Sequence, residues 1–315
     1  MEKSVFLFPG QGSQYVGMGK SLFDAYDFVR DRFHEASRLL DMNFQDLCFH
    51  GPEDRLTQTR NVQAAITLIN VACYETLARE GIRPAAAAGH SLGEYTALYA
   101  TGALDFEDAL LLVKTRGEYM QEWGEEIENA GLLSILGKTK IQGIDQVCQK
   151  ANVHVAVYNN DYQIVLGGYE ENLKHAKQMV EEMGFKGVPL KVSGPFHTYL
   201  MKPAADRMHT YLGDVDITIS ARPVIANTST RAIVDPMDIK NELTDQIFKP
   251  VLWKDCVEKM IESGVRFFVE IGPGKVLNGL IGKVDPNVKV LNVEDRQTLE
   301  RTMQDLIHLS SGAKA

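Results

Sequence analysis

The stretch Ala85-Ala86-Ala87-Ala88-Gly89-His90-Ser91-Leu92-Gly93-Glu94-Tyr95 decides how the chain is organised. A glycine lies two residues before the serine and another two residues after it, and a small, helix-favouring run follows. This pattern lets the backbone turn sharply from a strand into a helix, so that the Ser91 Oγ stands clear of the sheet at a helix N-terminus. The amide of Leu92 would then face negative charge forming on a carbonyl oxygen attacked by Ser91. Flexible Gly-Ser turns match the same pattern, so a catalytic serine also needs a base and a second oxyanion donor.

Composition narrows the class of protein. The 315 residues are 44% hydrophobic and 24% charged, which is ordinary for a soluble globular chain with a sizeable core. The net charge of −9 argues against broad binding to nucleic acid or to an anionic membrane. The four cysteines are scattered without a C-x-x-C spacing, and the chain enters an apolar strand directly after its first residues. We therefore expect reduced thiols, no membrane association and a cytoplasmic location. Metal-ligand spacings such as H-E-x-x-H are absent from the sequence, so we expect no metal site.

The first and last parts of the chain alternate strands with helices. An apolar run, Ser4–Phe8, predicts a buried strand that ends at a glycine-rich loop over residues 9–19. The loop fits neither the dinucleotide fingerprint nor the Walker spacing, although its amides remain suited to a small anion. Further periodic runs predict three long helices, one buried strand and one short strand, over residues 20–40, 61–79, 105–124, 265–271 and 224–227. Such alternation favours a mostly parallel sheet with helices on both faces.

The middle of the chain has a different pattern. Its elements read strand, helix, strand, strand, helix, strand over Leu132–Leu136, Ile141–Ala151, Val153–Tyr158, Gln163–Gly167, Glu171–Met183 and Gly187–Val192. This order is the ferredoxin-like pattern, which can pack as a small unit of its own. The sequence therefore predicts a small unit inserted into a larger α/β unit.

Two residues outside the serine turn stand out. Arg116 lies on the apolar side of the helix predicted over 105–124. A guanidinium there either binds an anion such as a carboxylate, or reaches solvent or a structural ion pair. His197 follows Ser193-Gly194-Pro195-Phe196, where the inserted unit returns to the large one, and clefts form at such junctions. It is either the base for Ser91 or an ordinary loop histidine, whereas His90 adjoins Ser91 and its side chain should diverge from it.

Taken together, these motifs are similar to those of the acyl-transferase family of fatty-acid and polyketide synthesis. The resemblance rests on the serine turn and on Arg116, together with four separated motifs in the family's order: Pro9–Gln14, Gln63, Gly194–His197 and Gln246–Pro250. It extends from the first strand to about Val293. The resemblance implies a large α/β-hydrolase-like subdomain with a parallel sheet, formed by residues 1–127 and 195–315, and an inserted ferredoxin-like small subdomain, residues 128–194.

The resemblance also implies roles for individual residues. Ser91 would be the nucleophile and His197 its base, oriented by the backbone carbonyl of Gln246. The amides of Gln11 and Leu92 would form the oxyanion hole. Arg116 would bind the free carboxylate of a malonyl group, and Gln63 and Phe196 would line the pocket.

The reaction that the resemblance implies is transfer of malonyl from malonyl-CoA, through an ester on Ser91, to the phosphopantetheine thiol of an acyl carrier protein in fatty-acid synthesis. It implies no permanently bound cofactor. Three alternatives are weighed against this reaction. A discrete acyltransferase of a polyketide synthase would use the same residues. An acyl hydrolase of the same fold is disfavoured by Arg116, and a non-catalytic carrier-docking module would require Ser91 or His197 to be dispensable. Lysines near the small unit are candidates for binding an acidic carrier or are solvated surface residues: Lys174, Lys177, Lys186, Lys191 and Lys202.

Overall fold

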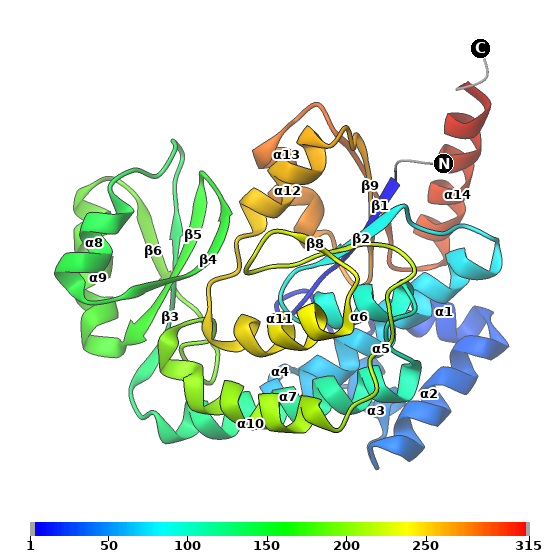
Figure 1. The fold of residues 1–315 in the computed structure, drawn as a ribbon, viewed down its shortest axis with the longest axis horizontal. Helices are drawn as coiled ribbons and strands as arrows, with labels where there is room; N and C mark the ends of the chain where they lie inside the picture. The colour runs from blue at the N-terminus through cyan, green and yellow to red at the C-terminus, as the bar shows by residue number, and fades with distance from the viewer. Residues whose placement is uncertain (1–3, 313–315) are drawn as a thin grey trace.

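The computed structural model describes residues 4–312 of the chain, and the side chains of residues 4–306. Its larger part is built on a six-stranded sheet in the order β10-β9-β1-β2-β7-β8 (Figure 1). Neighbouring strands run parallel except for the antiparallel pair β7 and β8. The strands are β1 (Ser4–Phe8), β2 (Ala86–Gly89), β7 (Val224–Ile225), β8 (Ala232–Ile233), β9 (Phe267–Ile271) and β10 (Lys289–Val293).

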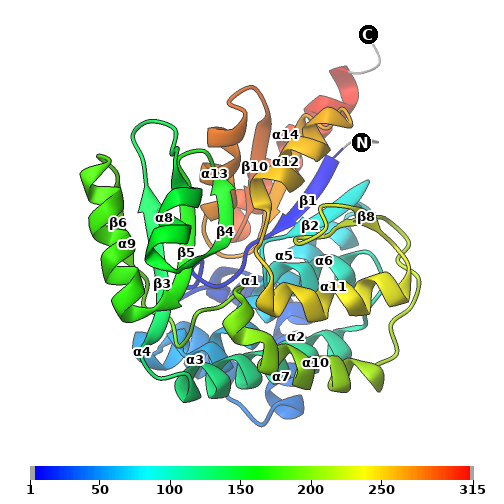
Figure 2. The ribbon, with the colours of Figure 1, turned by 60° about the vertical axis from the view of Figure 1, so that its left-hand side comes forward.

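Helices cover both faces of this sheet, as the alternation predicted. In Figures 1 and 2, α5 and α6 lie on one side, while α12 and α13 lie on the other. Every residue of β1 is buried, because this central strand is covered on both faces. The helices are α1 (Lys20–Ala25), α2 (Asp27–Leu39), α3 (Phe44–Phe49), α4 (Glu53–Thr57), α5 (Thr59–Arg79), α6 (Gly93–Ala100), α7 (Phe106–Glu126), α10 (Lys202–Gly213), α11 (Pro236–Phe248), α12 (Trp253–Glu262), α13 (Val276–Val284) and α14 (Arg296–Gly312), with a 3₁₀ turn at Tyr199–Met201.

The turn between β2 and α6 depends on close backbone approach. A Cβ atom at Gly89 would overlap the backbone of Gly93, and a Cβ atom at Gly93 would overlap the carbonyl of Phe8. Ser91, between them, has a φ of 50°, in the left-handed region that L-residues rarely adopt. The glycines are therefore required so that the strand, the turn and the helix pack tightly while Ser91 is held at the tip.

The smaller part is an antiparallel four-stranded sheet in the order β4-β5-β3-β6. Its strands and helices are β3 (Ala130–Leu136), α8 (Ile144–Ala151), β4 (His154–Asn160), β5 (Gln163–Tyr169), α9 (Glu170–Glu182) and β6 (Lys186–Pro189). In Figure 1 the two helices lie on the outer face of the sheet, where they enclose a separate apolar core. This arrangement confirms the ferredoxin-like prediction. The boundaries proposed at residues 128 and 194 remain predictions.

The two parts meet along β4 and the segment that precedes α12. Tyr158 N donates to Val251 O at 2.8 Å, and Val251 N donates to Ala156 O at 3.0 Å. On the face of the small sheet away from its helices, Leu132 and Val165 join the main core. The inner face of the small sheet thus forms one wall of the space above the serine turn.

Several predicted elements differ in extent: β6 ends at Pro189 and α8 begins at Ile144, and two further differences are larger or lie near the serine turn. The helix expected over residues 20–40 is two helices, because Tyr26 is extended at φ −130° and ψ 126°. There the Arg30 guanidinium donates to the carbonyl of Phe23 at 2.7 Å, which satisfies an orphan acceptor at the end of α1. The strand expected over residues 224–227 ends at Ile225, so Asn227 lies outside the sheet and its side chain contacts the serine turn. Within the described residues, no helix is both long enough and apolar enough to cross a membrane.

Candidate active site

The structure brings Ser91 and His197 together although they are 106 residues apart in sequence. Ser91 Oγ lies 2.8 Å from His197 Nε2, which is hydrogen-bonding distance for a nucleophile and its base. His197 itself has a φ of 62°, and its amide donates to Ile247 O at 3.1 Å. Both residues therefore lie on strained backbone that the surrounding structure holds in place.

The ring of His197 is held in one tautomer. Its Nδ1 lies 2.6 Å from the backbone carbonyl oxygen of Gln246, which can only accept a hydrogen bond, so Nδ1 carries the proton. The neutral ring then presents an unprotonated Nε2 to the Ser91 hydroxyl. Burial, with a further effect from the positive charge of Arg116, lowers the pKa of His197 from 6.5 to about 3. The imidazole is consequently neutral at physiological pH and able to accept a proton.

Arg116 extends from α7 to the same point. The whole residue is 1% exposed, and burial lowers the pKa of its guanidinium. Its Nη2 donates to Ser91 Oγ at 3.1 Å and to Gln246 Oε1 at 2.9 Å, while Nη1 donates to Gln63 Oε1 at 2.8 Å. All three acceptors are uncharged, and no carboxylate among the described residues forms a salt bridge with Arg116. A buried guanidinium without an anion is suited to bind one that arrives with a ligand.

Two backbone amides near Ser91 are free to stabilise an anion. The amide of Ser91 itself donates to Asn227 Oδ1 at 2.7 Å. By contrast, the amides of Gln11 and Leu92 have no hydrogen-bond acceptor among the described residues, and both residues line the cavity at Ser91. Gly10 brings the two segments together, since a Cβ atom there would overlap the carbonyl of His90. The pair has the arrangement expected of an oxyanion hole.

Ser91, Arg116 and His197 line a cavity of about 230 Å³. Phe196, 4% exposed, and Met120 lie along it beside Ser91 and His197, and the inner face of the small sheet supplies Leu132 and Val165. Helix α13 closes another side through Val276, Leu277 and Leu280. The walls are therefore mainly apolar, which strengthens electrostatic interactions at the few polar groups.

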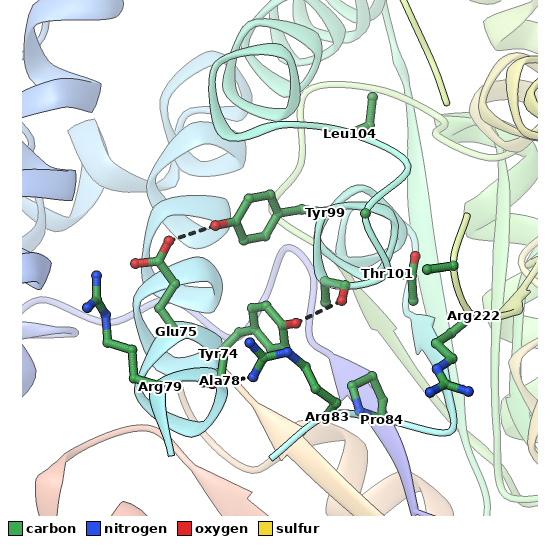
Figure 3. Close-up of a pocket in the computed structure, with 13 residues that line it drawn as sticks. Tyr74, Glu75, Ala78, Arg79, Arg83, Pro84, Tyr99, Thr101, Leu104 and Arg222 are labelled. Atoms are coloured by element: carbon green, nitrogen blue, oxygen red, sulfur yellow. Dashed lines mark hydrogen bonds between the residues drawn. The ribbon is translucent and has the colours of Figure 1, made fainter. Parts of the chain in front are cut away.

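A larger cavity of about 700 Å³ lies elsewhere, between the second half of α5 and the end of α6. In Figure 3 the Tyr99 hydroxyl is directed at Glu75, and the Tyr74 hydroxyl is directed at the backbone of residue 100. The described residues that line it include arginines but neither serine, cysteine nor histidine. Its lining residues offer no serine–histidine pair like that of Ser91 and His197, so the smaller cavity is the candidate active site.

Three residues of the site were not singled out from the sequence. Asn227 bridges the serine turn, because it accepts from the Ser91 amide and donates through Nδ2 to Gly89 O at 2.7 Å. Asn159 Oδ1 lies 2.8 Å from His90 Nε2, so the His90 ring is directed to Asn159. Glu94 is buried and lies beside the Gln246 side chain. Of these three residues, only Glu94 could have been noticed from the sequence, because it is a lone carboxylate in an apolar helix.

The sequence and the fold were compared with those of known proteins. The model of the family described as acyl transferase domain matches residues 5–299. The chain is 42% identical to malonyl CoA-acyl carrier protein transacylase of Bacillus subtilis over 311 residues, covering 97% of this chain and 98% of the relative. The crystal structure of malonyl CoA-acyl carrier protein transacylase from Clostridium perfringens superimposes with a TM-score of 0.93 at 39% identity, covering 99% of this chain and 100% of the other. A malonyl-transacylase solved in complex with a type II PKS acyl-carrier protein gives a TM-score of 0.92 at 33% identity, over 96% of this chain and 99% of its own.

Proposed function

This chain belongs to the acyl transferase family, and we propose that it transfers malonyl groups from malonyl-CoA to the phosphopantetheine thiol of an acyl carrier protein. Relatives that match over nearly their whole length carry the name malonyl CoA-acyl carrier protein transacylase, which supports this reaction. The acyl carrier protein bound to a structural neighbour supports the same class of partner here.

One observation supports malonyl in particular: Arg116 Nη2 lies 3.1 Å from Ser91 Oγ, the atom that would be acylated. In a malonyl ester on Ser91, a single methylene separates the ester carbonyl from the free carboxylate. That carboxylate can therefore fold back onto a guanidinium that already touches the ester oxygen. An acetyl group has no carboxylate and would leave the buried guanidinium without an anion.

The acylation step can be derived from the positions of Ser91 Oγ and His197 Nε2. His197 Nε2 takes the Ser91 proton while Oγ forms a bond to the thioester carbonyl carbon. The carbonyl oxygen becomes an oxyanion, which the amides of Gln11 and Leu92 stabilise. The carbon–sulfur bond then breaks, and the departing thiolate takes the proton from His197, so that coenzyme A leaves as a thiol and Ser91 carries the malonyl ester.

The second half runs in reverse with a different thiol. The phosphopantetheine sulfur of the carrier gives its proton to His197 and attacks the ester, and Ser91 Oγ recovers a proton as it leaves. The two thiols bind in turn to one site, so ping-pong kinetics are expected. Throughout, Gln246 O holds Nδ1 and so keeps Nε2 directed at the reacting oxygen.

A transfer assay tests the proposal. The protein is mixed with malonyl-CoA and a holo-carrier of fatty-acid synthesis, a holo-carrier of polyketide synthesis, or buffer alone, and malonyl-carrier and free malonate are both quantified. We expect malonyl-carrier with the fatty-acid carrier and little free malonate. Faster transfer to the polyketide carrier would assign the chain to that pathway, and rapid release of malonate without a carrier would identify a hydrolase.

A further inference from the structure

Glu94 is a buried carboxylate that the proposed reaction does not use. It lies three residues after Ser91 on α6 and is fully buried. Its Oε2 accepts a hydrogen bond from Gln246 Nε2, whereas its Oε1 has no partner among the described residues. Burying an acidic side chain in this way is costly, and burial together with the nearby Glu242 raises its pKa. A residue this unfavourable for stability calls for a functional explanation.

The side-chain amide of Gln246 connects Glu94 with Arg116. Its Oε1 accepts from Arg116 Nη2 at 2.9 Å, and its Nε2 donates to Glu94 and also to Ser91 O at 3.0 Å. If the amide were flipped, its NH₂ group would face the guanidinium donors, and its oxygen would face two acceptors. The carboxylate of Glu94 therefore fixes the orientation in which the amide oxygen faces Arg116.

The indirect contact matters because of what a direct one would do. A carboxylate paired with Arg116 would occupy the donors that the malonyl carboxylate needs. With the amide oxygen of Gln246 held toward Arg116, the contacts of the guanidinium remain with uncharged oxygens. Arg116 is thereby held in position and stays available to an incoming anion.

We propose that Glu94 is a positioning residue that holds the Gln246 amide oxygen toward Arg116, and thereby sets the preference for a carboxylated acyl group. This inference rests on the proposed function. Glu94 touches neither the acyl group nor the reacting atoms, so its effect reaches the substrate through Gln246 and Arg116.

The test compares Glu94→Leu with a matched control, Glu242→Leu. Glu242 is also a buried carboxylate, but it accepts from Thr228 and Ser229 and has no hydrogen bond with Gln246. The rate of Ser91 acylation is measured by intact mass with malonyl-CoA and with acetyl-CoA, and thermal unfolding is followed in parallel. For Glu94→Leu, which removes the acceptor that orients the amide, we expect the malonyl-to-acetyl ratio to fall about ten- to one-hundredfold, the effect of losing one hydrogen bond to a charged group. Glu94→Gln keeps an acceptor for Gln246 Nε2 and should retain the ratio, and Glu242→Leu should also keep it.

A purely structural role for Glu94 would slow both donors alike and leave the ratio unchanged, which would overturn the inference. Gln246→Met provides a second route, since it removes the amide but keeps the backbone carbonyl that holds His197. We expect it to lower the ratio as Glu94→Leu does, and the double variant to lower it no further. Additive losses would contradict the connection through Gln246. If wild-type protein is not acylated by malonyl-CoA at all, the proposed function fails instead.

Discussion

Replacing Arg116 by alanine should remove the preference for malonyl while retaining part of the chemistry. The guanidinium is fully buried, and its Nη2 donates to Ser91 Oγ at 3.1 Å. His197, its partner carbonyl and the two free amides remain in the variant. We therefore expect acylation to continue, but without selection for a carboxylate.

The magnitude follows from the hydrogen bonds that would be lost. A guanidinium can give two charge-assisted hydrogen bonds to a carboxylate, each contributing about 1.5–3 kcal/mol. Loss of both corresponds to ~3–6 kcal/mol, or roughly a 10²- to 10⁴-fold fall in kcat/KM for malonyl-CoA. The acetyl reaction loses only the one hydrogen bond between Arg116 and Ser91 Oγ, so its kcat/KM should fall by the smaller factor of about ten- to one-hundredfold. Lysine should not restore selection, because it lacks the planar fork that reaches Gln63 and Gln246 together.

The assay is the initial rate of Ser91 acylation with each donor over a range of concentrations, for wild type, Arg116→Ala and Arg116→Lys. Thermal unfolding of each variant serves as the control for folding. Parallel losses for malonyl and acetyl, in variants that remain folded, would refute the assigned role of Arg116. So would a wild-type protein that accepts both donors equally.

Three further changes test the surrounding framework. Asn227→Ala leaves the Ser91 amide and the Gly89 carbonyl without their buried partners, so unfolding free energy should fall by about 1–3 kcal/mol and kcat should fall with it, whereas no loss in either would contradict the bridging role. Gly93→Ala would push a methyl group into the Phe8 carbonyl, so the free energy of unfolding should fall by about 1–3 kcal/mol or more, measured by thermal unfolding. The control Gly279→Ala places its methyl group in open space on α13 and should leave the stability of the protein unchanged or increase it. Burial raises the pKa of Glu270 from 4.5 to about 7, so its contribution to stability is full below about pH 4.5 and is lost as pH rises through about 7. The melting temperature of Glu270→Gln should therefore depend less on pH over this range than that of wild type, and an unchanged dependence would contradict the assignment.

The sequence was informative where local rules and tertiary packing agree. The glycines around Ser91 and the apolar run of β1 each require a specific local backbone, and each lies where it was expected. The small unit was also predictable, because short elements in a fixed order leave few ways to form one antiparallel sheet.

Other features depend on contacts between distant segments. Tyr26 has no residue nearby that demands a helix break, so a continuous helix was the natural expectation, and only the packing of α1 and α2 shows otherwise. Asn227 is one of many asparagines in the chain, and its importance comes from the 2.7 Å contact with a serine 136 residues away. The convergence of Ser91, Arg116 and His197 was suggested by family resemblance, since no local pattern relates them.

The central claim is that the Ser91 hydroxyl carries the malonyl group between two thiols. Intact mass and peptide mapping of the protein after brief mixing with malonyl-CoA test it most directly. The account predicts a malonyl adduct on the peptide that contains Ser91, its discharge on adding a holo-carrier, and no adduct in Ser91→Ala. An adduct on another residue, or full transfer by the alanine variant, would contradict it.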